Sequence, residues 1–306
     1  MNRPVVLATR GSDLALAQTR DIAAKLRDAW RGLDVVEEII RTRGDQNLDA
    51  DLARLGALDK GLFTKELEAA LLEQRADAAV HSLKDLPTTL PEGLALGAIL
   101  RRAPDEDILV SKHDGGLDAL PAGAKVGTGS PRRQAMLRAQ RPDLHPALLR
   151  GNVPTRLRKL AEGNYDAIIL AAAGLQRLGW TPHGAIEITG AVFSATTLDK
   201  FLPAPGQGAV AVEIRDGDRE IIAHLQPLHD EATARCVRAE RSVLSGLGGG
   251  CHMALGTRAR IVKDQIILDA VVFDDRGWQP KHASATGPAD DPETLGRLVA
   301  DLLHGD

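Results

Sequence analysis

The sequence has few aromatic residues, only two cysteines and no long apolar run. Phe, Trp and Tyr make up 3% of the 306 residues, so Leu, Val, Ile and Ala must build the cores. Cys236 and Cys251 offer no disulfide framework and fit a reducing compartment. The longest apolar runs, such as Ala167 to Leu175, are far shorter than the ~20 residues of a membrane helix. The chain start has no signal-peptide apolar core. We therefore expect a cytoplasmic protein that does not enter a membrane.

The chain also lacks an excess of positive charge. Its formal net charge of −4 disfavours non-specific binding of nucleic acid. Hydrophobic residues at 43% and charged residues at 26% are typical of a globular protein, and the length suffices for two or three domains. Arginines nevertheless recur at turn-like positions, namely Arg10, Arg132, Arg133, Arg150, Arg156 and Arg177. This pattern favours a small polyanionic ligand in a cleft.

Strands alternate with amphipathic helices up to about residue 200. A strand at 5–8 precedes a helix over 13–29, and a helix over 64–75 precedes a strand at 78–81. Near residue 100 the pattern restarts, with a strand at 125–127 and a helix from Pro131 to about Gln140. This alternation predicts a first α/β domain with a largely parallel sheet and, from about residue 100, a second α/β domain.

From about residue 218 the sequence shows a different pattern of predicted elements. A helix over 231–244 leads to a glycine cluster and Cys251, and two strands at about 254–262 and 265–273 follow. A helix from about Pro292 closes the chain. We expect a smaller α+β domain with an antiparallel sheet.

Ser130-Pro131-Arg132-Arg133 is the most informative short element for binding. Ser at the N-cap and Pro at the first helical position mark a helix start. Arg132 and Arg133 then lie where the helix dipole disfavours positive charge, by ~0.3–1 kcal/mol each. An anion on this helix end would offset that cost. The alternative is a solvated helix start with incidental arginines.

Arg10-Gly11-Ser12 makes a similar strand-to-helix turn, and its alternative is a simple capped turn. Arg150-Gly151-Asn152 and Arg156 would extend the anion site.

Asp85 follows a short strand and precedes Pro87, so it would project from the carboxyl end of the sheet, where open α/β folds bind ligands. It is a candidate general acid or base, although an aspartate in a turn is more often structural. Lys84 is either a nucleophile or a carboxylate partner. His81 is expected to be a packed histidine.

Cys251 follows three glycines, which let a bulky group approach the backbone closely. It is a candidate nucleophile or attachment point, with a small buried residue as the alternative. Cys236 lies within a predicted helix and is expected to be inert. Neither cysteine has a partner at zinc spacing.

Taken in order, these segments resemble those of the porphobilinogen deaminases. The resemblance covers roughly Val5 to Gly256 and rests on Arg10–Ser12 with Leu14–Gln18, Lys60–Glu68, Ala79–Pro87, Val126–Arg133, Arg150–Val153, Pro203–Gly208 and Gly249–Cys251.

The resemblance implies a dipyrromethane cofactor joined by a thioether to Cys251. It implies a domain of residues 1–99 and 200–217, an inserted domain of 100–199, and a third domain of 218–306. The first two domains would resemble type II periplasmic binding proteins. It further implies that Asp85 is catalytic. Residues expected to hold the cofactor are Lys84, Asp85, Ser130, Arg132, Arg133, Arg150 and Arg156; those expected to contact substrate are Arg10, Ser12, Gln18, Phe63, Arg150, Arg156, Arg177 and Gln207.

The implied activity is that of a hydroxymethylbilane synthase. Four porphobilinogen molecules would be joined stepwise, with arginines binding the acetate and propionate groups and Asp85 stabilising the cation formed as ammonia leaves. Gly129, Ala254, Pro154 and Asp105-Glu106 depart from common family residues.

Two alternatives from other classes stay open. A non-catalytic clamshell binding protein for an organic anion explains the α/β domains and the arginines, but not Gly249-Gly250-Cys251. A regulator's effector domain lacks a preceding helix-turn-helix. We expect a monomer, and the loop from Arg43 to Asp59 is either a lid or plain surface.

Overall fold

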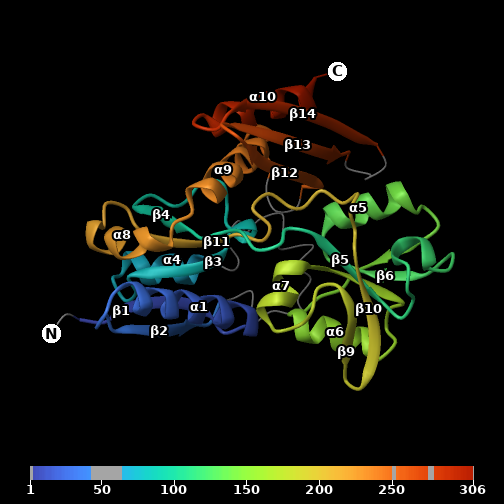
Figure 1. The fold of residues 1–306 in the computed structure, drawn as a ribbon, viewed down its shortest axis with the longest axis horizontal. Coiled ribbons are helices and arrows are strands. Elements are labelled where there is room, and N and C mark those ends of the chain that lie inside the picture. The colour runs from blue at the N-terminus through green and yellow to red at the C-terminus, as the bar shows by residue number, and fades with distance from the viewer. Residues whose placement is uncertain (1–2, 43–63, 250–252, 275–278, 306) are drawn as a thin grey trace. The chain divides into compact units, whose positions relative to one another are not determined.

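The structure is a computed structural model that describes residues 3–42, 64–249, 253–274 and 279–305 (Figure 1). The chain divides into two compact units, Met1–Arg102 with Ala209–Ala234, and Ala103–Gly208 with Arg235–Asp306. The first unit is therefore discontinuous in sequence. The three-domain boundaries predicted above stay a prediction.

The first unit contains a mixed five-stranded sheet of order β2-β1-β3-β11-β4 in its described part. The strands are β1 (Val5–Arg10), β2 (Val35–Ile40), β3 (Ala78–Ser82), β4 (Leu94–Ile99) and β11 (Val210–Arg215). β1 runs parallel to β2 and β3, whereas β11 runs antiparallel to β3 and β4. Four of these five strands run in the same direction, so the first sheet is largely parallel as predicted, and β11 of the returning segment is inserted between β3 and β4 in the opposite direction.

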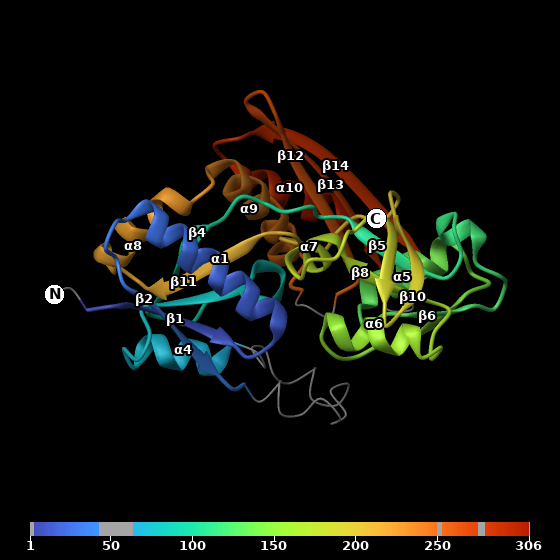
Figure 2. The ribbon, with the colours of Figure 1, turned by 60° about the horizontal axis from the view of Figure 1, so that its bottom comes forward.

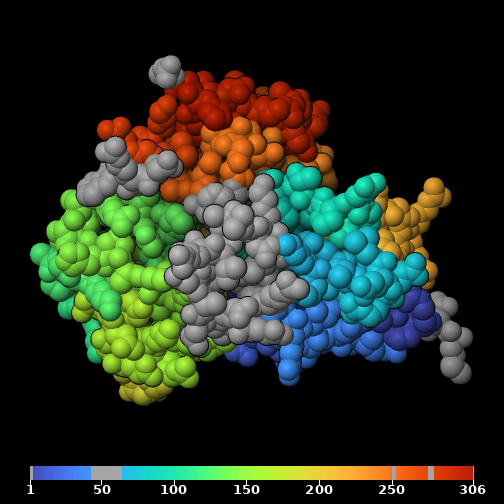
Figure 3. All heavy atoms as spheres, turned by 180° about the vertical axis from the view of Figure 1, so that it is seen from behind, coloured from blue at the N-terminus to red at the C-terminus, as the bar shows by residue number. Residues whose placement is uncertain are grey.

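Helices cover both faces of this sheet because successive strand residues point to opposite sides. Leu7 packs with Ile22 and Leu26 of α1 (Asp13–Ala29), while the next residue, Ala8, packs with Leu67 of α4 (Lys65–Leu72). Figure 2 shows α1 and α4 on opposite sides of the sheet. α8 (Arg219–Leu225) packs on the α1 side of the sheet and contacts β4. The gold atoms of this part of the chain lie at the edge of the molecule in Figure 3.

Capping and backbone conformation set the ends of these helices. The Ser12 hydroxyl accepts from the Ala15 amide, and α1 has the predicted bounds. α4 ends at Leu72 rather than at Arg75 as predicted, because Gln74 takes a left-handed conformation with φ of 59°.

The second unit contains a mixed six-stranded sheet of order β7-β6-β8-β5-β10-β9 among its described residues. Its strands are β5 (Asp107–Ser111), β6 (Lys125–Gly127), β7 (His145–Ala147), β8 (Ala167–Ala171), β9 (Gly184–Ile188) and β10 (Ala191–Thr197). β6 is parallel to β7 and β8, but β5 and β10 run antiparallel to their neighbours. β10 therefore runs in the same direction as β6, β7 and β8, while β5 and β9 run the opposite way.

Helices again cover the two faces of the second sheet. Ile169 packs in the cluster of α5 (Pro131–Gln140), and the adjacent Ile168 packs in that of α6 (Val153–Ala161) and α7 (Ala172–Arg177). The predicted bounds of α5 are confirmed, and Gly163, with φ of 79°, follows the end of α6.

The C-terminal part forms a separate antiparallel sheet, as predicted. Its strands are β12 (Leu255–Val262), β13 (Gln265–Phe273) and β14 (Pro280–Pro288). α9 (Glu231–Gly246) and α10 (Pro292–His304) pack on it, with Val243 and Val299 against Leu268. The short 3-10 helices are η1 (Leu83–Asp85), η2 (Gly116–Ala119) and η3 (Gln226–Leu228). None of the described helices is long and apolar enough to cross a membrane.

Candidate active site

The second sheet gathers its polar residues at one edge. β6, β7 and β8 are parallel, so the segments that follow them start at the same edge and carry Ser130, Arg150 and Arg177. β5 runs the other way, and its first residue, Asp107, pairs with Ala171, the last residue of β8. Asp107 therefore lies at the carboxyl edge of the sheet.

The start of α5 has the predicted form. Ser130 is the N-cap, and its hydroxyl accepts from the Arg133 amide at 3.4 Å. Pro131 fills the first helical position, so Arg132 and Arg133 follow in the first turn. Both arginines are almost fully buried, with 2% and 5% of their surface exposed. The interpretation as a solvated helix start is therefore wrong.

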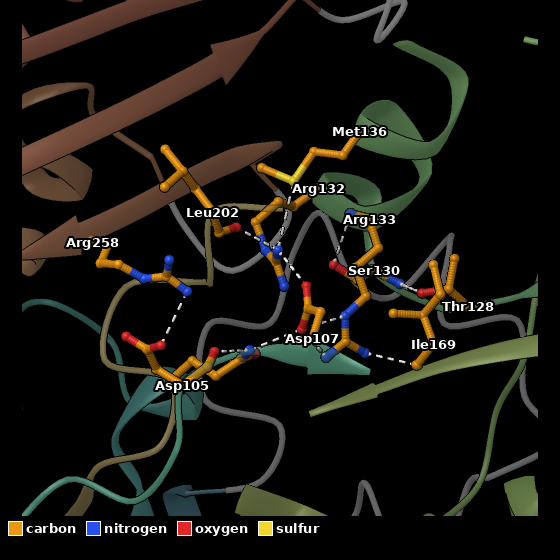
Figure 4. Close-up of polar contacts among 11 residues, drawn as sticks. Asp105, Asp107, Thr128, Ser130, Arg132, Arg133, Met136, Ile169, Leu202 and Arg258 are labelled. Carbon is orange, nitrogen blue, oxygen red and sulfur yellow. Dashed lines mark hydrogen bonds and ion pairs between the residues drawn. The ribbon is translucent and has the colours of Figure 1, made fainter. Parts of the chain in front are cut away.

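Asp107 supplies a protein anion for both arginines (Figure 4). Its Oδ2 accepts from Arg132 Nη1 at 2.7 Å, and its Oδ1 accepts from Arg133 Nε at 3.1 Å and Nη2 at 2.7 Å. Arg132 Nη1 also donates to the Leu202 carbonyl at 2.6 Å, and Arg133 Nη1 to that of Ile169 at 3.0 Å. Asp107 is fully buried, so this contact satisfies a charge that would otherwise be costly.

The electrostatics of this cluster leave an excess of positive charge. Burial acts to raise the pKa of Asp107, but the Arg132 and Arg133 guanidiniums hold it well below its usual range. Burial lowers the pKa of Arg132, against the opposing effect of Asp107. Two guanidiniums face one carboxylate, which leaves one positive charge. The Nε of Arg132 is buried and has no hydrogen-bond partner in the described part of the chain.

Gln207 joins this cluster to the segment that leads out of the second unit. Its Nε2 donates to Asp107 Oδ1 at 2.8 Å and to the Asp105 carbonyl at 2.7 Å, and the residue is 1% exposed. Arg177 Nη2 donates to the Gly208 carbonyl at 2.7 Å, and the Gly206 amide donates to Glu240 at 2.8 Å. The structure therefore places Gln207 against Asp107 and Asp105, where the sequence predicted a substrate contact.

Arg150 and Arg156 flank the start of α6. Asn152 caps this helix by accepting from the Thr155 amide at 2.9 Å, and Gly151 has φ of 113°, a left-handed value that favours glycine. Arg156 Nε donates to the Gly151 carbonyl at 2.7 Å, and Lys159 donates to the Arg150 carbonyl at 3.2 Å. Both arginines are half-buried, and together they add two positive charges to this helix end.

The first unit carries the predicted catalytic turn at the carboxyl edge of its own sheet. β1 ends at Arg10 and the parallel β3 ends at Ser82, so Arg10 and the η1 residues Lys84 and Asp85 follow neighbouring strand ends. Gln18 of α1 is buried, and its Nε2 donates to the Ser82 hydroxyl at 2.9 Å.

The carboxylate of Asp85 is held at the surface of its unit. Leu83 and Leu86 on either side of the turn are buried, Lys84 is half-buried and Asp85 is exposed. The two leucines anchor the turn, so the Asp85 side chain projects outward, as the Leu86-Pro87 pattern predicted.

His81 is a packed residue, as expected. It is buried beside the fully buried Glu213, with 3.0 Å between Nε2 and a Glu213 carboxylate oxygen. Glu68 is also buried, and burial raises its pKa.

Three predicted features lie outside the described residues: Cys251, Phe63 and the Arg43–Asp59 loop. Cys236 is described, and it is 8% exposed within the apolar cluster between α9 and the C-terminal sheet. Among the described residues, no group of three or more His, Cys, Asp or Glu side chains is arranged to hold a metal ion.

Asp107 is the site residue that sequence reasoning missed. A signal for it existed: an acidic residue opens the apolar run Ile108-Leu109-Val110, and a buried carboxylate needs a cationic partner. The arrangement as a whole can bind carboxylate groups at two helix starts in the second unit, and the first unit presents an exposed carboxylate.

Two family models match the chain. The model described as "Porphobilinogen deaminase, dipyromethane cofactor binding domain" matches residues 5–223, and "Porphobilinogen deaminase, C-terminal domain" matches residues 234–305. The porphobilinogen deaminase of Syntrophobacter fumaroxidans is 45% identical over 298 residues, covering 97% of this chain and 93% of the relative. That of Stenotrophomonas maltophilia is 48% identical over 302 residues, covering 99% and 96%.

Solved structures with a partial likeness include the BvgS VFT2 domain of Bordetella pertussis, at 17% identity and a TM-score of 0.41, covering 72% of this chain and 84% of that one. An ancestral cationic amino acid solute binding protein matches at 12% identity and a TM-score of 0.43, covering 74% and 87%. Both scores are below 0.5, so the α/β fold class rests on the sheets described above.

Proposed function

The chain belongs to the porphobilinogen deaminase family, and from this membership we propose that it is a hydroxymethylbilane synthase. This transferase joins four porphobilinogen molecules head to tail and releases hydroxymethylbilane and ammonia. The observation that carries the proposal beyond the family match is the buried arginine pair at the start of α5. It has one positive charge in excess, and the Nε of Arg132 has no acceptor among the described residues, as expected for a carboxylate-binding site.

The residues at this edge fit the dipyrromethane cofactor, whose acetate and propionate groups are carboxylates. Ser130, Arg132 and Arg133 would hold one carboxylate at the start of α5, and Arg150 and Arg156 would hold others at the start of α6. Lys84 of the first unit would add a further cation. When bound, the cofactor supplies the pyrrole carbon on which the new chain grows.

Attachment of the cofactor is assigned to Cys251. Cys236 is packed in the core between α9 and the C-terminal sheet, where a thioether-linked group of two pyrroles has no room. Cys251 follows Gly249 and Gly250, which supports an attachment point that a bulky group can approach.

Asp85 is assigned the catalytic role. Its exposed carboxylate would accept a hydrogen bond from a pyrrole N–H and stabilise the positive charge that develops as ammonia leaves. Gln18 and the flanking leucines fix the turn that carries it, so the carboxylate is held ready before substrate binds.

Arg10, Ser12, Arg150, Arg156 and Arg177 are assigned to the carboxylates of substrate. Each porphobilinogen carries two such groups, so every added ring requires further cations, and guanidiniums bind planar carboxylates through both oxygens. Gln18, Phe63 and Gln207 complete the proposed substrate set. We further propose that the protein acts in the cytoplasm as a monomer and binds no nucleic acid.

The test is the intact mass of the purified protein beside that of Cys251→Ala. We expect the native protein to carry extra mass equal to two linked pyrroles, and the variant to lack it. Cys236→Ala is the matched control and should retain the extra mass. Protein from a precursor-poor host should gain this mass on incubation with porphobilinogen.

Each result has a defined meaning. A mass gain in Cys251→Ala would refute the attachment point. A native protein that binds porphobilinogen without ever gaining mass would be the non-catalytic clamshell binding protein instead.

A further inference from the structure

We propose that Asp107 is a positioning residue that holds the Arg132 and Arg133 guanidiniums in one orientation, so that the pair receives a single carboxylate of the pyrrole chain. The inference rests on the proposed function, because that function uses these two arginines. Asp107 itself is buried beneath them and acts only through them (Figure 4).

The contacts of Asp107 define the orientation of both guanidinium planes. Arg133 binds Asp107 Oδ1 through two nitrogens, Nε and Nη2, which fixes the plane of its guanidinium. Arg132 binds Oδ2 through Nη1 only. That nitrogen also donates to the Leu202 carbonyl, while the Nε of Arg132 has no acceptor in the part of the chain that the structure describes. The Asp107 carboxylate thus fixes the Nη1 end of the Arg132 guanidinium and leaves its Nε able to donate a hydrogen bond.

Asp107 is suited to this task because it is itself held rigidly. It is the first residue of β5, its carbonyl accepts from the Leu198 amide at 2.9 Å, and it pairs with Ala171 of β8. Gln207 adds a hydrogen bond to Oδ1 from the neighbouring segment. Arginine side chains otherwise have many rotamers, and fixing them before the ligand arrives lowers the cost of binding.

The charge count makes the inference specific. Two arginines without Asp107 would present two positive charges, and with it they present one. If Asp107 merely subtracted charge, its removal would strengthen the attraction for a polycarboxylate. If it positions the arginines, its removal weakens binding even though the local charge becomes more favourable. The two roles therefore predict opposite results for the same substitution.

The experiment compares Asp107→Asn with a matched control that removes another aspartate paired with an arginine. Asp143→Asn removes an aspartate that binds Arg141 at 2.7 Å just beyond the C-terminal end of α5, where the pair is partly exposed. Proteins from a precursor-poor host are incubated with porphobilinogen, and the rate at which each gains the mass of two pyrroles is followed by mass spectrometry. Urea unfolding of each variant is measured in parallel.

We expect the native protein and Asp143→Asn to gain mass at similar rates. Folded Asp107→Asn should gain mass at least about tenfold more slowly, because a misplacement of about 1 Å can lower a rate by about a hundredfold. Asp107→Glu retains the charge but moves the carboxylate, and it should also gain mass slowly. If Asp107→Asn does not fold, the rate of mass gain of Asp107→Glu tests the proposal in its place.

Two results would overturn the inference. One is folded Asp107→Asn that gains mass at the native rate or faster, which leaves only a structural or charge-lowering role. The other is Asp107→Glu gaining mass at the native rate, because charge rather than position would then suffice. If the native protein itself gains no mass, the proposed function fails, and the inference fails with it.

Discussion

Gly208 allows a direct test of the close backbone contact between the first and last residues of the segment 103–208 of the second unit. The residue has φ of 88°, and a Cβ placed on it would lie 2.4 Å from the Ala103 carbonyl oxygen and 3.2 Å from that of Pro104. Both obstacles are backbone atoms, which cannot rotate away. The Gly208 carbonyl also accepts from the Ala103 amide at 3.2 Å and from Arg177 Nη2 at 2.7 Å. Gly208→Ala must therefore separate the segments through which the chain enters and leaves this unit.

The expected loss of unfolding free energy has two parts. A left-handed conformation costs an alanine about 1–2 kcal/mol. Forcing a methyl group against packed backbone typically adds about 1–3 kcal/mol. Gly217→Ala is the matched control, because Gly217 has φ of 74° but none of the described residues comes within 4 Å of its added Cβ. The control should lose only the first part.

The measurement is the urea midpoint of both variants and of the native protein. Because the midpoint is the unfolding free energy divided by a slope of a few kcal/mol per molar, Gly208→Ala should unfold at about 0.5–1 M less urea than Gly217→Ala. Equal midpoints for the two variants would show that the Ala103 carbonyl imposes no steric limit, and the reasoning would be wrong.

Three further predictions concern catalysis, capping and pH. Asp85→Asn should lower kcat by about a hundredfold or more while leaving the urea midpoint unchanged, because the side chain is exposed; normal turnover would remove Asp85 from the mechanism. Ser130→Ala should lower the unfolding free energy by about 1 kcal/mol through loss of the α5 cap, and thermal unfolding that matches the native protein would contradict this. Burial raises the pKa of Glu68 in the folded protein above its pKa in the unfolded chain. The contribution of Glu68 to the free energy of unfolding is therefore fully present below the unfolded-chain pKa and is lost as the pH rises through the folded pKa. Glu68→Gln should therefore be more stable than the native protein at pH 8 and lose that advantage at pH 4, and urea midpoints showing the opposite trend would refute the sign.

Local signals in the sequence were sufficient for most helices. The Ser12 and Ser130 caps and the apolar spacing predicted α1 and α5 with their observed bounds, because capping and periodicity act over a few residues. α4 was predicted too long because the left-handed conformation of Gln74 has no strong sequence signal. β14 was missed because its face toward the helices carries only small residues such as Ala283 and Ala285, a weak apolar pattern.

The candidate site was predictable in part. The arginines at helix starts and the turn at Asp85 could be found from the sequence, since each depends on a cap, a proline or a strand end nearby. The partner of the arginines could not be found in that way. Asp107 lies 25 residues before Arg132, and the two meet only because β5 runs antiparallel to β8.

Residue chemistry and short-range pattern thus specified which elements form and where positive charge gathers, because helix caps, turns and burial periodicity are local properties. Strand order and direction are not local, since they depend on how segments far apart in the chain pair. That pairing buried Asp107 under Arg132 and Arg133 and turned Gln207 toward Asp107. Two arginines that the sequence alone would present to a ligand as separate charges therefore form, in the folded chain, one pre-oriented group with a single positive charge in excess.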